Sequence, residues 1–227
     1  MRAQGGEAIA VRCDITKVRD TLAMARQVKD AFGRIDVLVN NAAIFPRQPF
    51  LDMTLAFWKE HLDINLTGQF LCCKAVVPRM INQKAGGSII NLSSLVSIWS
   101  SVPGLLAYST GKAAVNRFSS ALAQELKPYD IAVNALDPGA IRSEGVVDYV
   151  LEKGASPLEE QGYYWAPPLP RVIGPSVIWL ARQRANTFTG YFLHRVEFGK
   201  KWGPGIKPPP SPLDMDVSHL RARPDMD

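Results

Sequence analysis

Residues 87–136 read GSIINLSSLVSIWSSVPGLLAYSTGKAAVNRFSSALAQELKPYDIAVNAL, and they indicate the fold class. Residues 87–93 and 131–136 are short and largely apolar, which is typical of strands. Residues 108–126 lie between them and carry apolar side chains at the spacing of an amphipathic helix. A strand, a helix and a second strand in this order predict two parallel strands that are joined by a crossover helix.

The same alternation continues before and after these residues. Strands are predicted at residues 7–13, 34–40 and 191–196, and helices at residues 18–32, 54–81 and 175–182. Residues 34–40 form a nearly continuous apolar run, as strands of a parallel sheet do when both of their faces are buried. The alternation therefore predicts an α/β fold, in which helices cover both faces of a doubly wound parallel sheet over residues 1–202.

The last 25 residues, 203–227, differ in composition because they contain six prolines. Proline lacks a backbone donor and fixes one backbone angle, so this segment is predicted to be a tail outside the domain. Two alternatives remain for it. It is either a mobile or loosely attached tail, or an arm that lies on a neighbouring subunit.

Composition narrows the classes of protein and partner. The chain has 227 residues, a net charge of +5 and a sequence pI of about 9.2, but its basic residues are scattered, so no nucleic-acid partner is expected. The chain contains no apolar run long enough to span a membrane and no secretory signal pattern. Its three cysteines, Cys13, Cys72 and Cys73, do not have the spacing of a zinc site. A cytoplasmic protein without a metal ion is the expectation.

One pair of residues on the predicted helix 108–126 has a chemical use. Tyr108 and Lys112 are four residues apart, which places both side chains on one helical face. A nearby ammonium group favours the phenolate and lowers the pKa of a tyrosine, so Tyr108 could exchange a proton with an alcohol or a carbonyl. Ser94, at the end of a predicted strand, could donate a hydrogen bond to the same oxygen.

At this point the chain resembles the short-chain dehydrogenase/reductase family over residues 2–199. The motifs that carry the resemblance are NNAA at 40–43, DINLTG at 63–68, SIINLSS at 88–94, YSTGK at 108–112 and DPGAI at 137–141. The resemblance implies a Rossmann-like sheet and an NAD(P)-dependent enzyme that interconverts an alcohol and a ketone or aldehyde. It also implies a homodimer or homotetramer that pairs the helices predicted at 54–81 and 108–126.

The family's catalytic residues match four positions here. The resemblance makes Tyr108 the acid–base, Lys112 its neighbour that also binds the nicotinamide ribose, and Ser94 the residue that orients the carbonyl. It makes Asn65 the holder of a proton-relay water near the lysine.

The resemblance also implies a set of cofactor-binding residues along one edge of the sheet. They are Asp14, Ile15, Asn41, Ala42, Ala43, Tyr108, Lys112, Pro138, Gly139, Ile141 and Ser143. In the family, the first two positions meet the adenine, the turn at 41–43 passes the adenosine ribose, and the loop after 137 lies under the nicotinamide. Ala43 stands where the family usually has glycine, and Ser143 keeps the hydroxyl of a common threonine that bonds the carboxamide.

The family's glycine-rich pyrophosphate turn has no counterpart in this sequence. We therefore expect a sheet that lacks the family's first two strand–helix units, with the strand at 7–13 unpaired and the strand at 34–40 as an exposed edge. The sequence is then either part of a longer enzyme or a product that cannot bind the cofactor normally. The residue that selects NAD or NADP belongs to the absent part, so the choice cannot be read. We expect these 227 residues alone to have no measurable activity and to bind NAD(P) weakly.

A second hypothesis is that the chain is a non-catalytic remnant of the family, which acts only through subunit association. The substrate itself is weakly encoded. The segment 144–170 is expected to cover the active site and contains Tyr149, Tyr163, Tyr164 and Trp165. Aromatic side chains suit a sugar ring, a steroid or another cyclic ketone. The alternative is that these rings only pack the covering segment itself.

Overall fold

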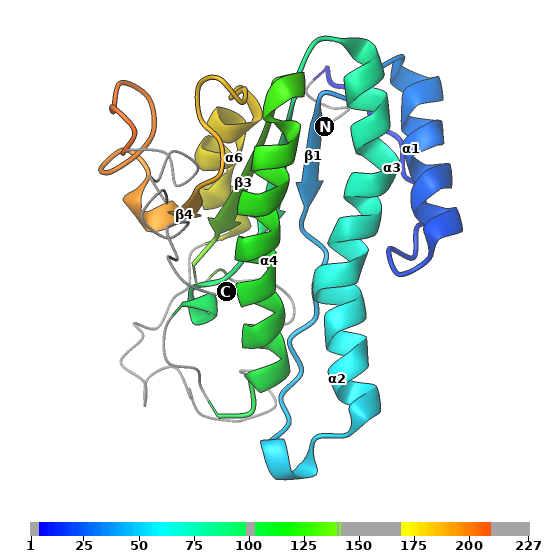
Figure 1. Ribbon diagram of the computed structural model, residues 1–227, viewed down its shortest axis with the longest axis vertical. Coiled ribbons are helices and arrows are strands. Elements are labelled where there is room, and N and C mark those ends of the chain that lie inside the picture. The colour runs from blue at the N-terminus through cyan, green and yellow to red at the C-terminus, as the bar shows by residue number, and fades with distance from the viewer. Residues whose placement is uncertain (1–4, 99–102, 140, 142–168, 210–227) are drawn as a thin grey trace, which may run out of the picture.

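A parallel sheet of four strands forms the centre of the computed structural model, which describes residues 5–98, 103–139, 141 and 169–209 (Figure 1). The strands are β1 (Val37–Asn40), β2 (Gly87–Leu92), β3 (Ile131–Asp137) and β4 (Phe192–His194), and they are ordered β1-β2-β3-β4. Every neighbouring pair is parallel. The prediction of an α/β fold with a parallel sheet is confirmed.

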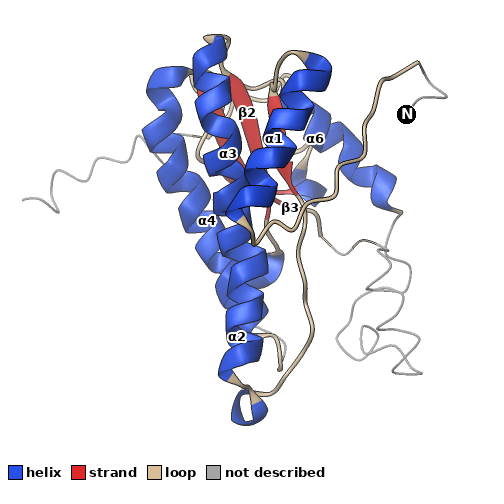
Figure 2. Ribbon diagram, turned by 90° about the vertical axis from the view of Figure 1, so that its right-hand side faces the viewer, coloured by secondary structure: helices blue, strands red, loops and turns tan. Residues whose placement is uncertain are grey.

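Helices cover both faces of this sheet, as a doubly wound fold requires. On one face lie α3 (Gly68–Gln83) and α4 (Leu106–Leu126), with α1 (Val18–Phe32) packed against α3. On the other face lies α6 (Gly174–Ala181), and Figure 2 shows the strands between these two layers. The helices predicted at 18–32, 108–126 and 175–182 are thereby confirmed to within two residues at either end.

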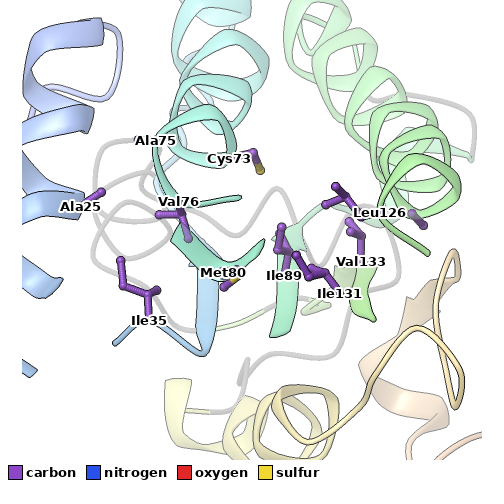
Figure 3. Packing of buried hydrophobic residues seen from close by; sticks show 11 residues of the cluster. Ala25, Ile35, Cys73, Ala75, Val76, Met80, Ile89, Leu126, Ile131 and Val133 are labelled. Carbon is purple, nitrogen blue, oxygen red and sulfur yellow. The ribbon is translucent and has the colours of Figure 1, made fainter. Parts of the chain in front are cut away.

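The core under α3 and α4 is built from the alternate side chains of the central strands. Ile89, Ile131 and Val133 of β2 and β3 belong to one apolar cluster with Val76 and Met80 of α3 (Figure 3). All five side chains are at most 2% exposed, so each contributes about 1.5–3 kcal/mol of hydrophobic stabilisation. This packing fixes α3 and α4 against the sheet and thereby positions the residues at their amino ends.

The opposite core is largely aromatic. The Trp179 ring lies 4.9 Å from that of Phe188 and 5.7 Å from that of Trp202, and Phe188 stacks on Tyr191 at 4.1 Å. The Tyr191 hydroxyl donates a hydrogen bond of 2.8 Å to the Pro209 carbonyl. The described beginning of the proline-rich tail, residues 203–209, is thus bonded to the domain, and residues 210–227 lie outside the described part.

The predicted strand at residues 7–13 is wrong, because these residues form an irregular segment. A strand is stabilised by the hydrogen-bond ladder to a neighbour, and no neighbouring strand of the described sheet reaches this segment. The strand predicted at 34–40 begins only at Val37. The Gln83 side chain bonds both the amide and the carbonyl of Ile35 at 2.8 Å, and so replaces a strand partner there.

The long helix predicted at 54–81 is interrupted by a π-helical turn. It consists of α2 (Leu55–Leu62), the π segment Asp63–Thr67 and α3, which follow one another without a break. Thr54 caps α2 because its hydroxyl accepts a hydrogen bond of 3.1 Å from the Phe57 amide. In the part of the chain that the structure describes, no helix has the length and apolar character needed to cross a membrane.

Candidate active site

Two side chains of α4 face the carboxyl end of β2. Lys112 is 1% exposed, and its Nζ donates a hydrogen bond of 2.7 Å to the Leu92 carbonyl, the last residue of β2. The same Nζ lies 5.7 Å from the centre of the Tyr108 ring. Ser94 follows two residues after β2 and hydrogen-bonds the Tyr108 side chain. The structure therefore brings together three of the four residues that were predicted to be catalytic.

The protonation of Tyr108 is set mainly by its burial. Burial raises the pKa of the phenol, the hydrogen bond with Ser94 lowers it, and the charge of Asp137 raises it. The sequence motif predicts the opposite net direction, from the nearby lysine. The difference arises because desolvation penalises the charged phenolate and is the largest contribution.

Burial also changes the ionisation of Lys112. Removal from water lowers the pKa of its ammonium group from 10.5 to about 8. A lysine with this pKa can hold or release a proton close to neutral pH. The Lys112 ammonium group, with a pKa of about 8, is therefore a stronger acid than the Tyr108 phenol, whose pKa burial raises, so Lys112 can return a proton to a Tyr108 phenolate.

Asn65, the fourth predicted catalytic residue, lies in the π segment and is fully buried. Its Nδ2 donates to the Ile44 carbonyl and its Oδ1 accepts from the Ile44 amide, both at 2.9 Å. A Cβ at Gly111 would lie 3.5 Å from the Asn65 Cβ, which places Asn65 against α4, one residue from Lys112. The side chain therefore holds the loop after β1 beside the active-site helix, and its role in binding a water stays a prediction.

A cavity of about 660 Å³ lies beside this loop. Four of the residues predicted to bind the cofactor line it, namely Asp14, Ile15, Ala42 and Ala43. Ile44, which Asn65 holds, lines it as well. Asn41 is exposed and immediately precedes the lining residues. This volume lies within the range of ligand sites and accommodates an adenine ring and its ribose, so these residues fit the adenosine half of NAD(P).

Two local features shape the cavity wall. Asp14 accepts hydrogen bonds from the Thr16 hydroxyl at 2.7 Å and the Thr16 amide at 2.9 Å, and these bonds lower the pKa of its carboxyl group. Ile15 packs directly on the backbone of α3, since a Cβ at Gly68 would lie 2.6 Å from the Ile15 Cδ1. A larger residue at the start of α3 would therefore displace the Ile15 side chain, which is predicted to meet the adenine.

The loop predicted to lie under the nicotinamide follows β3. Pro138, Gly139 and Ile141 are half-buried there, and Ser143 lies outside the described residues. Arg195 Nε donates to the Pro138 carbonyl at 2.6 Å. Residues of this loop thus lie at the carboxyl end of the sheet, together with Ser94.

Sequence reasoning missed the polar contacts around the last residue of β3. Asp137 accepts hydrogen bonds from the Leu95 and Gly139 amides at 3.0 and 3.1 Å. Its second oxygen, Oδ2, lies 2.6 Å from His194 Nδ1, a close contact whose angles differ from those of an aligned hydrogen bond. An acidic residue before Pro138 was visible in the sequence, but nothing local linked it to a histidine 57 residues later.

Helices α3 and α4 form a hollow on their outer side. Its volume is about 320 Å³, and it is mostly apolar. Phe70 and Phe118 meet there with their ring centres 6.3 Å apart, and Phe70 is 43% exposed. Among the described residues, no group of three or more His, Cys, Asp or Glu side chains could hold a metal ion.

Comparison with known proteins gives a consistent result. The family model described as short chain dehydrogenase matches residues 1–153. A 3-oxoacyl-[acyl-carrier-protein] reductase of Synechocystis is 42% identical over 142 residues, which are 63% of this chain and 57% of that protein. The 3beta-hydroxysteroid dehydrogenase 1 of Eggerthella lenta is 33% identical over 209 residues, which are 89% of this chain and 77% of that protein.

Solved structures share the fold. A short-chain type dehydrogenase/reductase from Mycobacterium marinum superposes with a TM-score of 0.73 at 34% identity, over 85% of this chain and 76% of that one. The structure of ElxO with NADP bound superposes with a TM-score of 0.71 at 24% identity, over 80% of this chain and 73% of that one.

Proposed function

The chain belongs to the short-chain dehydrogenase/reductase family, and from this premise we propose that it carries the catalytic residues of an NAD(P)-dependent oxidoreductase. The reaction interconverts an alcohol and a ketone or aldehyde, with Tyr108 as the acid–base. The observation that supports this most directly is the meeting of Tyr108, Lys112 and Ser94 at the carboxyl end of β2. In open α/β sheets, this is the edge where ligands bind.

Each of these residues has a task in the reduction of a carbonyl. The bound nicotinamide of NADH or NADPH supplies the hydride. Ser94 donates a hydrogen bond to the carbonyl oxygen and orients it. Tyr108, which burial keeps neutral, donates its proton to that oxygen. Lys112, with a pKa of about 8, is the nearest group that can return a proton to the phenolate. Oxidation of an alcohol uses the same groups in reverse.

The cofactor is held at two places in this proposal. The cavity that Asp14, Ile15, Ala42 and Ala43 line receives the adenosine, and Asn41 lies at its edge. Pro138, Gly139 and Ile141 support the nicotinamide, with Ser143 beyond them. The structural neighbour ElxO was solved with NADP bound, which supports a nicotinamide dinucleotide here without choosing between NAD and NADP.

The substrate is proposed to be a small alcohol or ketone. The names of relatives include a steroid dehydrogenase and a trans-4-hydroxycyclohexanecarboxylate dehydrogenase, whose substrates contain rings. Phe45 supports a cyclic substrate, because its ring meets the Tyr108 ring edge-on with the centres 6.2 Å apart. All three cysteines are free thiols, which fits the reducing cytoplasm that we propose as the location.

The test is Tyr108→Phe, which removes the proton carrier and leaves the ring. Turnover of NADH or NADPH with a panel of ketones is measured for this chain and for a version preceded by two strand–helix units of a relative. We expect turnover from the extended protein, and a fall of about 100-fold or more in its Tyr108→Phe variant. Cofactor affinity, measured by nucleotide fluorescence, should be almost unchanged. A variant that keeps more than about a tenth of the rate would contradict the role of Tyr108.

The alternative function is subunit association without catalysis, which the apolar hollow between α3 and α4 favours. The same fluorescence titration separates the two. Saturable binding of NADH or NADPH by the extended protein supports the oxidoreductase. An extended protein that associates but binds neither nucleotide supports the alternative.

A further inference from the structure

Asp137 is a buried carboxylate at the active-site end of β3, and the proton transfer described above does not use it. Asp137 is 1% exposed. A charge removed from water in this way is costly unless hydrogen bonds or an opposite charge compensate it. The contacts of Asp137 therefore indicate its structural role.

One oxygen of Asp137 joins two loops. Oδ1 accepts hydrogen bonds from the amide of Leu95, at 3.0 Å, and from the amide of Gly139, at 3.1 Å. Leu95 directly follows Ser94, and Gly139 belongs to the loop predicted to lie under the nicotinamide. A single carboxylate oxygen thus fixes the serine that orients the carbonyl relative to the loop that supports the cofactor.

The other oxygen faces β4. Oδ2 lies 2.6 Å from Nδ1 of His194, the last residue of β4, whose side chain is only 18% exposed. Arg195, the next residue, contributes a positive charge near Asp137, and its Nε donates a hydrogen bond to the Pro138 carbonyl. The contacts of Asp137 thereby connect the carboxyl ends of β2, β3 and β4.

We propose that Asp137, compensated by His194, is a positioning residue of the active site that also sets the electrostatic environment of Tyr108. The proposal rests on the function proposed above, because Tyr108 is the group on which Asp137 acts. Among the described residues, the titratable or charged groups that face Asp137 are His194 from β4, Arg195 from the turn Arg195–Glu197 and Tyr108 from α4. Tyr108 also faces Lys112 on its own helix.

The sign of the effect follows from Coulomb's law. A negative charge near a phenol disfavours the phenolate, and Asp137 raises the pKa of Tyr108 in this way. A positive charge on His194 offsets the charge of Asp137 and weakens that effect. Asp137 thus adds to the effect of burial, and both favour the protonated form of Tyr108, which is the proton donor in the reduction of a carbonyl.

The decisive variant is Asp137→Asn, because the amide oxygen still accepts the two backbone hydrogen bonds while the charge is removed. Ionisation of Tyr108 is followed by phenolate absorbance, as the difference between each protein and the same protein with Tyr108→Phe. We expect the Tyr108 midpoint to move to lower pH in Asp137→Asn. Asp130→Asn is the matched control, since Asp130 lies at the opposite end of β3 and should leave the midpoint in place. Equal midpoints in the two variants would overturn the electrostatic role.

The positioning role has its own measurement. Hydrogen exchange of the Leu95 and Gly139 amides should be faster in Asp137→Ala, which lacks the acceptor, and close to the parent in Asp137→Asn. If exchange at both amides is unchanged in Asp137→Ala, the carboxylate does not hold these loops. Should Asp137→Ala fail to fold, the comparison of Asp137→Asn with the parent still decides the electrostatic role.

Compensation by His194 is tested by a double-mutant cycle. His194→Gln leaves the buried carboxylate of Asp137 without its partner. The substitution should therefore lower the free energy of unfolding more in the parent protein than in the Asp137→Asn variant. Additive effects in urea unfolding would remove His194 from the proposal. These measurements need no turnover, so they stand even if the activity test fails, and the two failures remain distinguishable.

Discussion

The buried ammonium group of Lys112 makes the free energy of unfolding depend on pH, because its pKa differs between the folded and the unfolded chain. In the folded protein its pKa is lowered from 10.5 to about 8 by burial. Between these values the unfolded chain holds more protons than the folded one, so the free energy of unfolding rises with pH. Below pH 8 both states are protonated, and the full cost of the buried charge remains.

We predict that Lys112→Met removes this rise. Relative to the variant, the parent protein should gain about 3 kcal/mol of stability between pH 8 and pH 10.5, since each pKa unit corresponds to about 1.4 kcal/mol. Urea unfolding at several pH values measures the difference, and groups that titrate in both proteins cancel. If the two curves stay parallel over this window, the lysine does not bear the predicted cost.

Among the elements, the π segment Asp63–Thr67 differs from the flanking α-helices in its backbone hydrogen bonds, and this difference positions Asn65. The Gly68 amide bonds the Asp63 carbonyl, five residues earlier, and Asn65 sits at the middle of this wider turn. The Asn65 amide group is then able to make both hydrogen bonds to Ile44. The π segment therefore holds the loop after β1, which lines the cavity proposed for the adenosine.

We predict that Asn65→Ala lowers the free energy of unfolding by about 2–4 kcal/mol. The substitution removes two buried hydrogen bonds and leaves the amide and carbonyl of Ile44 without that partner. Thr67→Ala is the control, because Thr67 lies in the same segment and is exposed, so its effect should be within about 0.5 kcal/mol. Similar stabilities of the two variants, measured by urea unfolding, would contradict the prediction.

On the scale of the whole molecule, the outer face of α3 and α4 is the surface most suited to a second copy. Its apolar residues include the partly exposed Phe70, Val77, Phe118 and Leu122. Other apolar side chains of the same two helices, such as Val76 and Val115, are instead buried in the core of the domain. The homo-oligomer stays a prediction, and the structure narrows the residues on which it depends.

We predict that Phe118→Glu converts a dimer or tetramer into a smaller species, because the substitution places a charge in the hollow between the two helices. Light scattering during size-exclusion chromatography measures the mass. Ile178→Glu on α6 is the matched control, since Ile178 is 56% exposed on the opposite side of the sheet. A parent protein that is already a monomer at micromolar concentration would defeat the prediction.

The sequence pattern was sufficient for the parts of the fold that are stabilised by local periodicity and buried apolar runs. Residues 87–92 and 131–137 are strands because both of their faces are buried, and this leaves a clear signal in the sequence. Residues 7–13 show a similar signal but form no strand, because pairing depends on a neighbour that no local pattern contains.

The candidate site likewise contains features that the sequence predicts and features that depend on the folded chain. Tyr108 and Lys112 could be predicted because one helical turn separates them, and the motifs placed Ser94 near them. The pairing of Asp137 with His194 could not be predicted, since it depends on the order of β3 and β4 in the sheet. The raised pKa of Tyr108 is also a property of burial, which only the folded chain reveals.

The extra residue in the π turn makes the chain sensitive to length at this point. Each residue of an α-helix turns it by about 100°, and the wider π turn absorbs one extra residue, so α2 and α3 keep their relative rotation. A second residue inserted between 63 and 67 could not be absorbed in the same way and would rotate α2 relative to α3. His61, which is fully buried and bonded to the Phe57 carbonyl, would then leave the interior. Substitutions at the exposed positions Asp63 and Thr67 are compatible with the fold, whereas a further insertion there is not.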